Sequence, residues 1–390
     1  ALWKKVLGSR HPTYAQSLMD LGNLYTLTGN YNDAEQYYSQ AKLIVENTLG
    51  KSHPFYATLV NNLALLYKLK GEYNKAEPFY FEAINAVEKI FGKDHKDYAG
   101  HVSNLANLYQ EMGNYGKAEK LHIEALNIRE KIQGKEHFHY ANSLGSLALV
   151  YRSTGDLAKA DSMLSQAIFI YEKTLGKDHP DYAKGLSNLA GLYHEMERYD
   201  QARSLYDEAI AIQHSVLGKD HQDYATSLNG LASLLAFIGD YKRAEALLLE
   251  AKSIIEKTVG KNHSHYAGII NSLANLYRLT GAYGKITAIN TDLYHNISQQ
   301  ITGAFSFLPE NAKEKFIVQQ IEVYLDQIQS AGLSMQDPAY RNLLFNSALL
   351  TKGLQLQTSQ STLEFVLQQQ DSVVWVTYRQ LAGLHRRLAA

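Results

Sequence analysis

Residues 51–92 read KSHPFYATLVNNLALLYKLKGEYNKAEPFYFEAINAVEKIFG, and the same pattern returns along the chain in steps of 42 residues. One histidine, one tyrosine and one glycine of this stretch keep the step without an insertion or a deletion. The three series are His11, His53, His95, His137, His179, His221 and His263; Tyr14, Tyr56, Tyr98, Tyr140, Tyr182, Tyr224 and Tyr266; and Gly8, Gly50, Gly92, Gly134, Gly176, Gly218 and Gly260. The chain is therefore an array of repeats, in which each unit packs on its neighbours.

Each repeat predicts two helices. Pro54 suits the first position of a helix, where its missing N–H is tolerated. Leu59, Leu63 and further apolar residues follow at a spacing of three and four, and Gly71 ends this first helix. A second helix is predicted from about residue 73 to residue 90, and it stops at Gly92. Each unit is thus a pair of antiparallel helices.

Small residues recur where the helices of this pattern must touch, because a larger side chain would push their axes beyond the usual separation of about 8–10 Å. These positions hold Gly22, Ala64, Ala106, Ala148, Ala190, Ala232 and Ala274 on the first helix, and Ala34, Ala76, Ala118, Ala160, Ala202 and Ala244 on the second. Large side chains such as Tyr25, Tyr67, Tyr109, Tyr151, Tyr193 and Tyr277 are predicted to fill the gaps between neighbouring pairs.

The pattern L-A-x-L-Y, followed by G-x-Y-x-x-A-E and a later alanine, resembles the tetratricopeptide repeat. The 42-residue period with the linker G-K-D-H-P-D-Y-A, at residues 176–183, is similar to the longer version found in kinesin light chains. The resemblance covers residues 1–302. It implies an all-α fold, a right-handed superhelical solenoid of helical hairpins whose first helices line the concave side.

The repeats divide the chain into a partial unit at 1–8 and seven units at 9–50, 51–92, 93–134, 135–176, 177–218, 219–260 and 261–302. In the last unit Ile286 and Leu293 stand where the other second helices have alanine, and Asn290 replaces an apolar or aromatic residue. Because a terminal unit has no neighbour of the same shape, this helix is predicted to pack against something different.

Residues 303–390 lack the 42-residue period and form a predicted helical segment. Their start, F-S-F-L-P-E, and their ending, D-S-V-V-W-V-T-Y-R-Q-L-A-G-L-H-R-R-L-A, look like the segment that joins tetratricopeptide arrays to CHAT domains in bacterial proteins. CHAT domains are caspase-like proteases. The resemblance implies that 303–390 caps the array and that a C-terminal catalytic domain, absent from this sequence, would pack on it.

The composition excludes several functions. The sequence has no cysteine, which removes a cysteine nucleophile, disulfides and Cys-based zinc sites. No phosphate-binding loop or catalytic triad can be picked out, so the chain is predicted to be no enzyme and to carry no cofactor. One histidine per repeat cannot converge on a metal, because successive repeats lie about 10 Å apart and zinc needs its ligands at about 2 Å. We expect loop histidines bonded to neighbouring helix ends.

The balance of basic and acidic residues also argues against two classes of partner. The 38 basic and 39 acidic residues nearly cancel, so we expect neither nucleic acid nor a membrane as a partner. The repeated Lys51, Lys93 and Lys135 series has acids close by, which predicts a solvated and screened edge. We expect a cytoplasmic protein; since the chain starts at Ala1 rather than at methionine, a removed signal peptide stays an open alternative.

The candidate binding residues are first-helix side chains that the resemblance places on the groove side. They are Asn23, Asn61, Asn62, Asn104, Asn107, Lys184, Asn188, Asn229, Asn271 and Asn275. Asparagine is a mediocre helix former, so its recurrence on one face has another cause. Either these amides pair with an extended peptide or a partner protein, or they bond across neighbouring repeats and keep the helices in register.

We therefore predict a protein- or peptide-binding module, specifically the sensing and regulatory arm of a caspase-like CHAT protease. Two alternatives stay open at this point. One is a stand-alone scaffold or cargo adaptor, and the other is an array that senses RNA or a nucleoprotein. Lys184 is the main basic residue among the groove positions, so a groove that clamps a carboxylate with rows of Lys and Arg is not expected.

Overall fold

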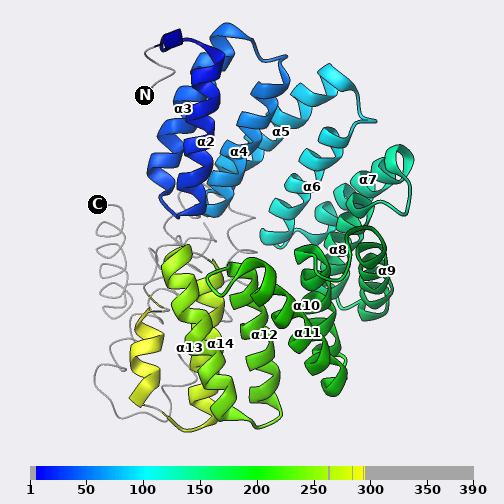
Figure 1. The fold of residues 1–390 in the computed structure, drawn as a ribbon, viewed down its shortest axis with the longest axis vertical. Coiled ribbons are helices and arrows are strands. Elements are labelled where there is room, and N and C mark those ends of the chain that lie inside the picture. Colours follow the sequence, from blue (N-terminus) through cyan, green and yellow to red (C-terminus); the bar gives the residue numbers. More distant parts are fainter. Residues whose placement is uncertain (1–5, 262–263, 283, 293, 295–390) are drawn as a thin grey trace, which may run out of the picture. The chain divides into compact units, whose positions relative to one another are not determined.

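The computed structural model of the chain describes residues 6–261, 264–282, 284–292 and 294. Every element with defined bounds in these residues is an α-helix (Figure 1), which confirms the predicted all-α class. The chain divides into two compact units, Ala1–His263 and Ser264–Ala390. The predicted boundary between residues 302 and 303 lies outside the described residues and stays a prediction.

The first unit is a series of six helical hairpins (Figure 1). Hairpins 1 to 6 are α2 (Pro12–Leu27) with α3 (Tyr31–Thr48), α4 (Pro54–Leu69) with α5 (Tyr73–Phe91), α6 (Lys96–Glu111) with α7 (Tyr115–Gln133), α8 (Phe138–Ser153) with α9 (Leu157–Leu175), α10 (Pro180–Glu195) with α11 (Tyr199–Leu217), and α12 (Gln222–Phe237) with α13 (Tyr241–Thr258). Each second helix packs on the first helix of its own hairpin, and those of hairpins 1 to 5 also pack on the first helix of the next hairpin. This is the arrangement of a solenoid.

The helix ends follow the repeated residues. Pro54 occupies the first turn of α4, and Gly92 caps α5 with φ 77°, a left-handed conformation that suits glycine. Between first and second helices, Gly71 adopts φ 74°. Hairpin 5 is an exception, because Glu197 stands at the position of Gly71 and adopts φ 61°. A side chain in this conformation carries backbone strain.

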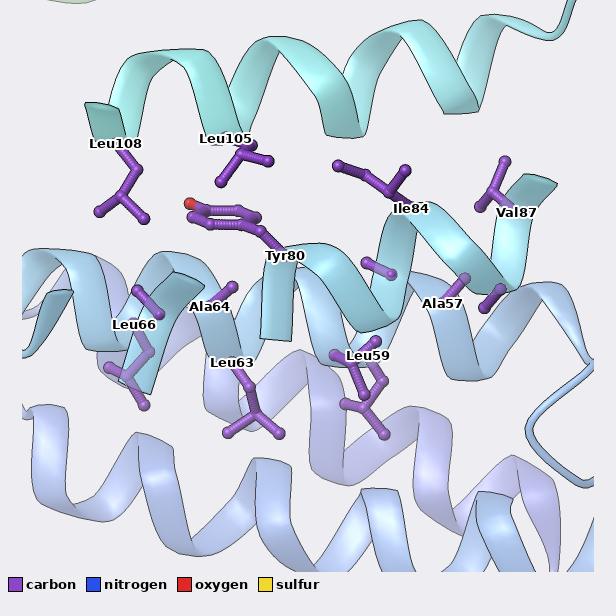
Figure 2. Packing of buried hydrophobic residues seen from close by; sticks show 14 of the residues in the cluster. Ala57, Leu59, Leu63, Ala64, Leu66, Tyr80, Ile84, Val87, Leu105 and Leu108 are labelled. Atoms are coloured by element: carbon purple, nitrogen blue, oxygen red, sulfur yellow. The ribbon is translucent and has the colours of Figure 1, made fainter. Parts of the chain in front are cut away.

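The core lies between the two helices of each hairpin and the first helix of the next. Figure 2 shows the ring of Tyr80, from α5, between Leu105 and Leu108 of α6 and Ala64 of α4. Tyr80 is 1% exposed, and Ala64 and Ala76 are fully buried. The predicted small residues therefore lie at the close contacts between helices, where a bulkier side chain would not fit.

The tyrosines do more than fill space, because their hydroxyls donate to carboxylates on neighbouring helices. Tyr67 Oη donates to Glu35 Oε1 at 2.7 Å, and Tyr151 Oη donates to Glu119 Oε1 at 2.9 Å. Tyr109 makes the same bond to Glu77. Each bond joins the first helix of one hairpin to the second helix of the hairpin before it, so the glutamate of the A-E motif links adjacent repeats.

A second tyrosine series ties the two helices of one hairpin together. Its bonds are Tyr56 to Glu82 at 2.6 Å, Tyr98 to Glu124 at 2.9 Å, Tyr182 to Glu208 at 3.3 Å and Tyr224 to Glu250 at 3.2 Å. Burial first and the nearby carboxylate second raise the pKa of Tyr182 to about 12. The protonated hydroxyl is therefore the stable form at neutral pH, as a donor to a carboxylate requires.

The bond between hairpins is replaced at one junction. Between hairpins 5 and 6, Leu235 stands at the position of Tyr151, and Arg203 stands at the position of Glu119. Leu235 is fully buried, while Arg203 lies 3.9 Å from Asp207 on its own helix. The tyrosine hydroxyl and its carboxylate acceptor are thus both absent at this junction, so neither of these two groups is left without its hydrogen-bond partner.

The second unit is described only in part. α14 (Ser264–Leu279) is the first helix of the predicted seventh repeat, and helical residues 284–292 follow it. Ile286 and Asn290, which break the repeat pattern, are fully buried. Leu293 and the whole 303–390 segment lie outside the described residues, so the predicted capping role and the predicted domain contact stay predictions.

Candidate functional site

The first helices of hairpins 1 to 6 form a continuous surface, because each contacts the first helix of the next hairpin. All the predicted binding residues belong to first helices, and they differ in exposure. Asn61 is buried; Asn23, Asn62, Asn104, Asn107, Asn188, Asn229 and Asn271 are partly buried; Lys184 and Asn275 are exposed. Asn271 and Asn275 belong to the second unit and are described apart from the others.

Four of these amides bond to one another across neighbouring hairpins. Asn62 Nδ2 donates to Asn23 Oδ1 at 3.0 Å, and Asn104 Nδ2 donates to Asn61 Oδ1 at 3.0 Å. Tyr38 Oη also donates to Asn23 Oδ1, at 2.7 Å. This geometry supports the second interpretation for these four residues, in which the amides keep adjacent first helices in register.

The other predicted residues of the first unit make no such bridge. Asn107 and Asn188 are partly exposed on α6 and α10, and Lys184 is exposed one turn before Asn188. The Oδ1 atom of Asn229 is shielded from solvent and accepts no hydrogen bond within the described residues. These side chains are the part of the predicted set that could contact a partner, and their binding role stays a prediction.

Ion pairs cross the same surface near the ends of the first helices. Lys68 Nζ lies 2.8 Å from Glu111 Oε1, and Arg152 Nη2 lies 2.6 Å from Glu195 Oε1. Each pair joins two successive first helices. Opposite charges therefore neutralise one another along this edge of the surface.

The repeated lysines were expected to be screened by the linker acids Asp94, Glu136, Asp178 and Asp220, but Lys93 and Lys135 pair with other acids. Lys93 lies 3.7 Å from Glu88, and Lys135 lies 3.2 Å from Glu130, so each pairs with the end of the preceding second helix. The linker acid Asp94 instead pairs with Lys131, at 2.5 Å. These pairs are exposed and contribute little to stability, but they leave the lysine edge screened.

The repeated histidines are helix N-caps. In the first unit, His53 Nδ1 accepts the backbone N–H of Phe55 at 3.1 Å, and His179 Nδ1 accepts that of Asp181 at 3.1 Å. His11, His95, His137 and His221 make the same bond. Across the described ranges, no group of His, Asp and Glu side chains could hold a metal ion. The same residues contain no helix long and apolar enough to cross a membrane.

A polar cluster in hairpins 3 and 4 was missed by the sequence reasoning. Arg129, on α7, donates to the hydroxyl of Ser143 on α8, which is 1% exposed. Tyr171 Oη, on α9, donates to Asn142 Oδ1 at 2.6 Å. Arg129 is partly buried, and this burial lowers the pKa of its guanidinium. One sequence feature indicates this cluster: Arg129 stands at a second-helix position that holds Val45 and Val87 in hairpins 1 and 2.

His122 lies two turns before Arg129 on the same helix. It is fully buried, and neither ring nitrogen has a hydrogen-bond partner in the described structure. Burial first and the charge of Arg129 second lower the pKa of His122 to about 4. The ring is therefore neutral at pH 7 and packs as a substitute for Tyr38, Tyr80 and Tyr206, which occupy this position in other hairpins.

Comparison with known proteins identifies the repeat. The tetratricopeptide repeat profile matches residues 1–42, 17–89, 97–173, 162–213 and 181–257. Among curated proteins, no relative matches the chain. A Rap protein complexed with the Competence and Sporulation Factor is similar in structure, with a TM-score of 0.54 and 15% identity over 97% of this chain and 99% of that one.

Two further solved structures are similar over part of the chain. BtubC (BKLC) from P. vanneervenii has a TM-score of 0.45 and 22% identity, over 58% of this chain and 89% of its own. A putative kinesin light chain from Podosopora anserina, with nearly identical TPR-like repeats, has a TM-score of 0.42 and 26% identity, over 53% of this chain and 97% of its own.

Proposed function

Because the chain belongs to the tetratricopeptide repeat family, we propose that it is a non-enzymatic protein-interaction module that holds a peptide or a partner protein along its first helices. The observation that carries the proposal is the contact between successive first helices. Asn107, Lys184 and Asn188 belong to these first helices and have polar side chains that water reaches, which supports the proposal. Such side chains can bond the main chain of an extended peptide.

The comparison with the Rap protein supports the proposal at the level of fold. That protein was solved in complex with the Competence and Sporulation Factor, and it is similar to this chain in fold, with a TM-score of 0.54. The bonds of Asn23, Asn61, Asn62 and Asn104 also support it indirectly. By fixing neighbouring first helices to each other, these amides hold the remaining side chains at constant spacing, which lowers the entropy lost on binding.

The test is selection of peptides from a displayed random library against the chain, followed by affinity measurements on variants. A groove variant changes Asn107, Lys184 and Asn188 to alanine. The matched control changes Lys120, Asn85 and Asn127, which are exposed on second helices. We expect the groove variant to bind the selected peptides at least about tenfold more weakly with an unchanged melting temperature. Equal affinity for both variants would refute the proposal.

A role as the regulatory arm of a CHAT protease is a narrower proposal. It depends on residues 303–390, which are outside the described structure, and on a catalytic domain beyond Ala390. Reading the natural gene past this codon tests it. A downstream domain with a histidine and then a cysteine supports the regulatory arm, and a stop codon supports the scaffold or adaptor instead.

The RNA-sensing alternative has less support. The repeated lysines that would contact phosphates lie beside glutamates, as Lys135 does with Glu130 at 3.2 Å and Lys177 with Glu172 at 3.3 Å. Nucleic-acid binding would have to displace these pairs and would weaken steeply with salt.

A further inference from the structure

One second-helix position changes from apolar to polar in the middle of the array. At steps of 42 residues it holds Val45, Val87, Arg129, Tyr171, Gln213 and Ile255. Val45, Val87 and Ile255 are buried, as this core position requires. Hairpins 3, 4 and 5 therefore place a guanidinium, a phenol and an amide in space that is apolar in the other hairpins.

This second-helix position faces a residue on the first helix of the next hairpin. That facing residue is small where the second-helix side chain is polar and large. Hairpin 2 has Leu59 there, whereas Ser143 faces Arg129. Gly185 faces α9, where a Cβ atom would lie 3.0 Å from Ile168 and in ordinary contact, at 3.5 Å, with the Tyr171 ring. The small residue opposite Arg129 therefore carries the argument, because the hydroxyl of Ser143 accepts from the guanidinium where Leu59 has an apolar side chain.

Arg129 is partly buried and, in the described part of the chain, has no acidic partner, in contrast to four other arginines of the first unit. Arg152, Arg198, Arg203 and Arg243 lie 2.6, 3.6, 3.9 and 3.6 Å from Glu195, Asp161, Asp207 and Asp240. For Arg129 no carboxylate among the described residues lies within 4.0 Å, and its only described bond is to Ser143. A guanidinium has five N–H donors, so most of its capacity is unused. A buried charge without a counter-charge is costly.

Other donors lie beside this guanidinium. Arg129 and Tyr171 are close enough for each to shift the pKa of the other. Tyr171 donates to the oxygen of Asn142, so the amide group of Asn142 is turned with its oxygen occupied and its N–H donors available. Burial first and the charge of Arg129 second lower the pKa of the neighbouring His139, whose imidazole ring cannot supply a negative charge in either form. Asp181 influences His139 and Tyr171 but does not pair with Arg129.

Part of the cluster reaches water. Arg129 and Asn142 are both partly exposed, whereas Ser143 is buried. Asn142 also occupies the first-helix position that Lys184 occupies one hairpin later, 42 residues on. A peptide along the first helices would therefore pass Asn142, which belongs to the cluster, and then an exposed lysine.

We propose that Arg129, with Asn142, Ser143 and Tyr171, is a subsite for one oxyanion, a carboxylate or phosphoryl group carried by the bound peptide. The proposal rests on the peptide-binding function above and specifies the chemistry of its ligand. The guanidinium supplies the counter-charge and two parallel N–H donors to the anion. Ser143 accepts from the guanidinium and fixes its plane, and Tyr171 orients the Asn142 amide.

The experiment measures the binding of small probes to the whole chain at constant ionic strength. Acetyl-aspartate amide represents a side-chain carboxylate, acetyl-asparagine amide is its neutral match, and inorganic phosphate represents a phosphoryl group. Binding is followed by thermal stabilisation and by protection of Arg129 from phenylglyoxal, read by peptide mass spectrometry. We expect at least one anion to bind at millimolar concentration and to protect Arg129, while the neutral probe does neither. The anion that binds more tightly shows whether the subsite takes a side-chain carboxylate or a phosphoryl group.

Variants decide whether Arg129 is responsible. Arg129→Gln should weaken anion binding at least about tenfold, while Arg203→Gln, an exposed arginine of hairpin 5, should leave it unchanged. If Arg129→Gln does not fold, the double change Arg129→Val and Ser143→Leu rebuilds the apolar pair of hairpins 1 and 2 and serves in its place.

Three results would overturn the subsite: no anion binding by the wild-type chain, equal binding of the neutral probe, or equal anion affinity in the Arg129 variant. If selected peptides bind the wild type and Arg129→Gln equally, the subsite is refuted and the peptide-binding function stands. If anions bind through Arg129 but no peptide is selected, the subsite stands and that function fails.

Discussion

The tyrosine-to-carboxylate bond between hairpins can be measured at Tyr151 and Glu119. Tyr151→Phe removes the hydroxyl that donates at 2.9 Å and keeps the ring, including its contact with the Lys159 ammonium 4.8 Å from the ring centre. Hydrogen bonds to charged groups contribute about 1.5–3 kcal/mol. Because Glu119 is partly exposed and water can replace the lost donor, we expect the coupling between the two side chains to be about 1 kcal/mol.

The assay is a double-mutant cycle in urea with Tyr151→Phe, Glu119→Gln and the double variant, which isolates the pair from other effects of each change. The junction of hairpins 5 and 6 allows the reverse experiment. Leu235→Tyr alone should destabilise the chain, because the new hydroxyl enters a buried position without a carboxylate to accept its hydrogen bond, and adding Arg203→Glu should restore stability. Coupling below about 0.3 kcal/mol in both cycles, the usual limit of additivity, would refute the argument that these bonds join the hairpins.

Three further effects follow from the geometry. His179→Ala should lower the free energy of unfolding by about 1 kcal/mol, because it removes a side-chain N-cap, while His179→Asn should retain most of it; equal losses in urea denaturation would contradict the cap. Glu197→Gly should raise the free energy of unfolding by about 1 kcal/mol, since it relieves a left-handed backbone at φ 61°, and a lower melting temperature would argue against strain. The pKa of His122 is lowered from 6.5 to about 4, so the unfolded chain takes up the proton first and stability is lost as pH falls from about 6.5 towards 4. His122→Tyr should remove about 3 kcal/mol of that loss, and an unchanged pH dependence of urea denaturation would exclude the effect.

The hairpins were predictable because their signals are local. The 42-residue step of Gly71 and Gly92 marks the two ends of every hairpin, and the predicted small residues, such as Ala64 and Ala76, lie at the close contacts. The histidine series was expected to bond to helix ends, and it does so through the N-cap of each first helix in the first unit. These features depend on residues that lie a few positions apart within one repeat, so the sequence alone reveals them.

The pairing of polar groups was less predictable, because it depends on which side chains meet across helices. The tyrosines were expected to fill gaps, but nothing in their spacing revealed that Tyr67 reaches Glu35, 32 residues earlier. Asn62 and Asn104 were offered as binding residues, and their bonds to neighbouring hairpins became visible only with the helices placed. Arg129 lies on a second helix, whereas the pattern of asparagines that predicts a binding surface runs along first helices and does not indicate it.

The exchange at Leu235 and Arg203 makes one junction unlike the others. Under force applied to both ends, a chain separates first at the junction held by the fewest hydrogen bonds and ion pairs. These bonds break at shorter extensions than apolar contacts do. With the hydroxyl-to-carboxylate link replaced there, and with strained Glu197 in the hairpin just before it, we expect this seam to part first. Hairpins 1 to 5 would then separate from hairpin 6 before either part unfolds.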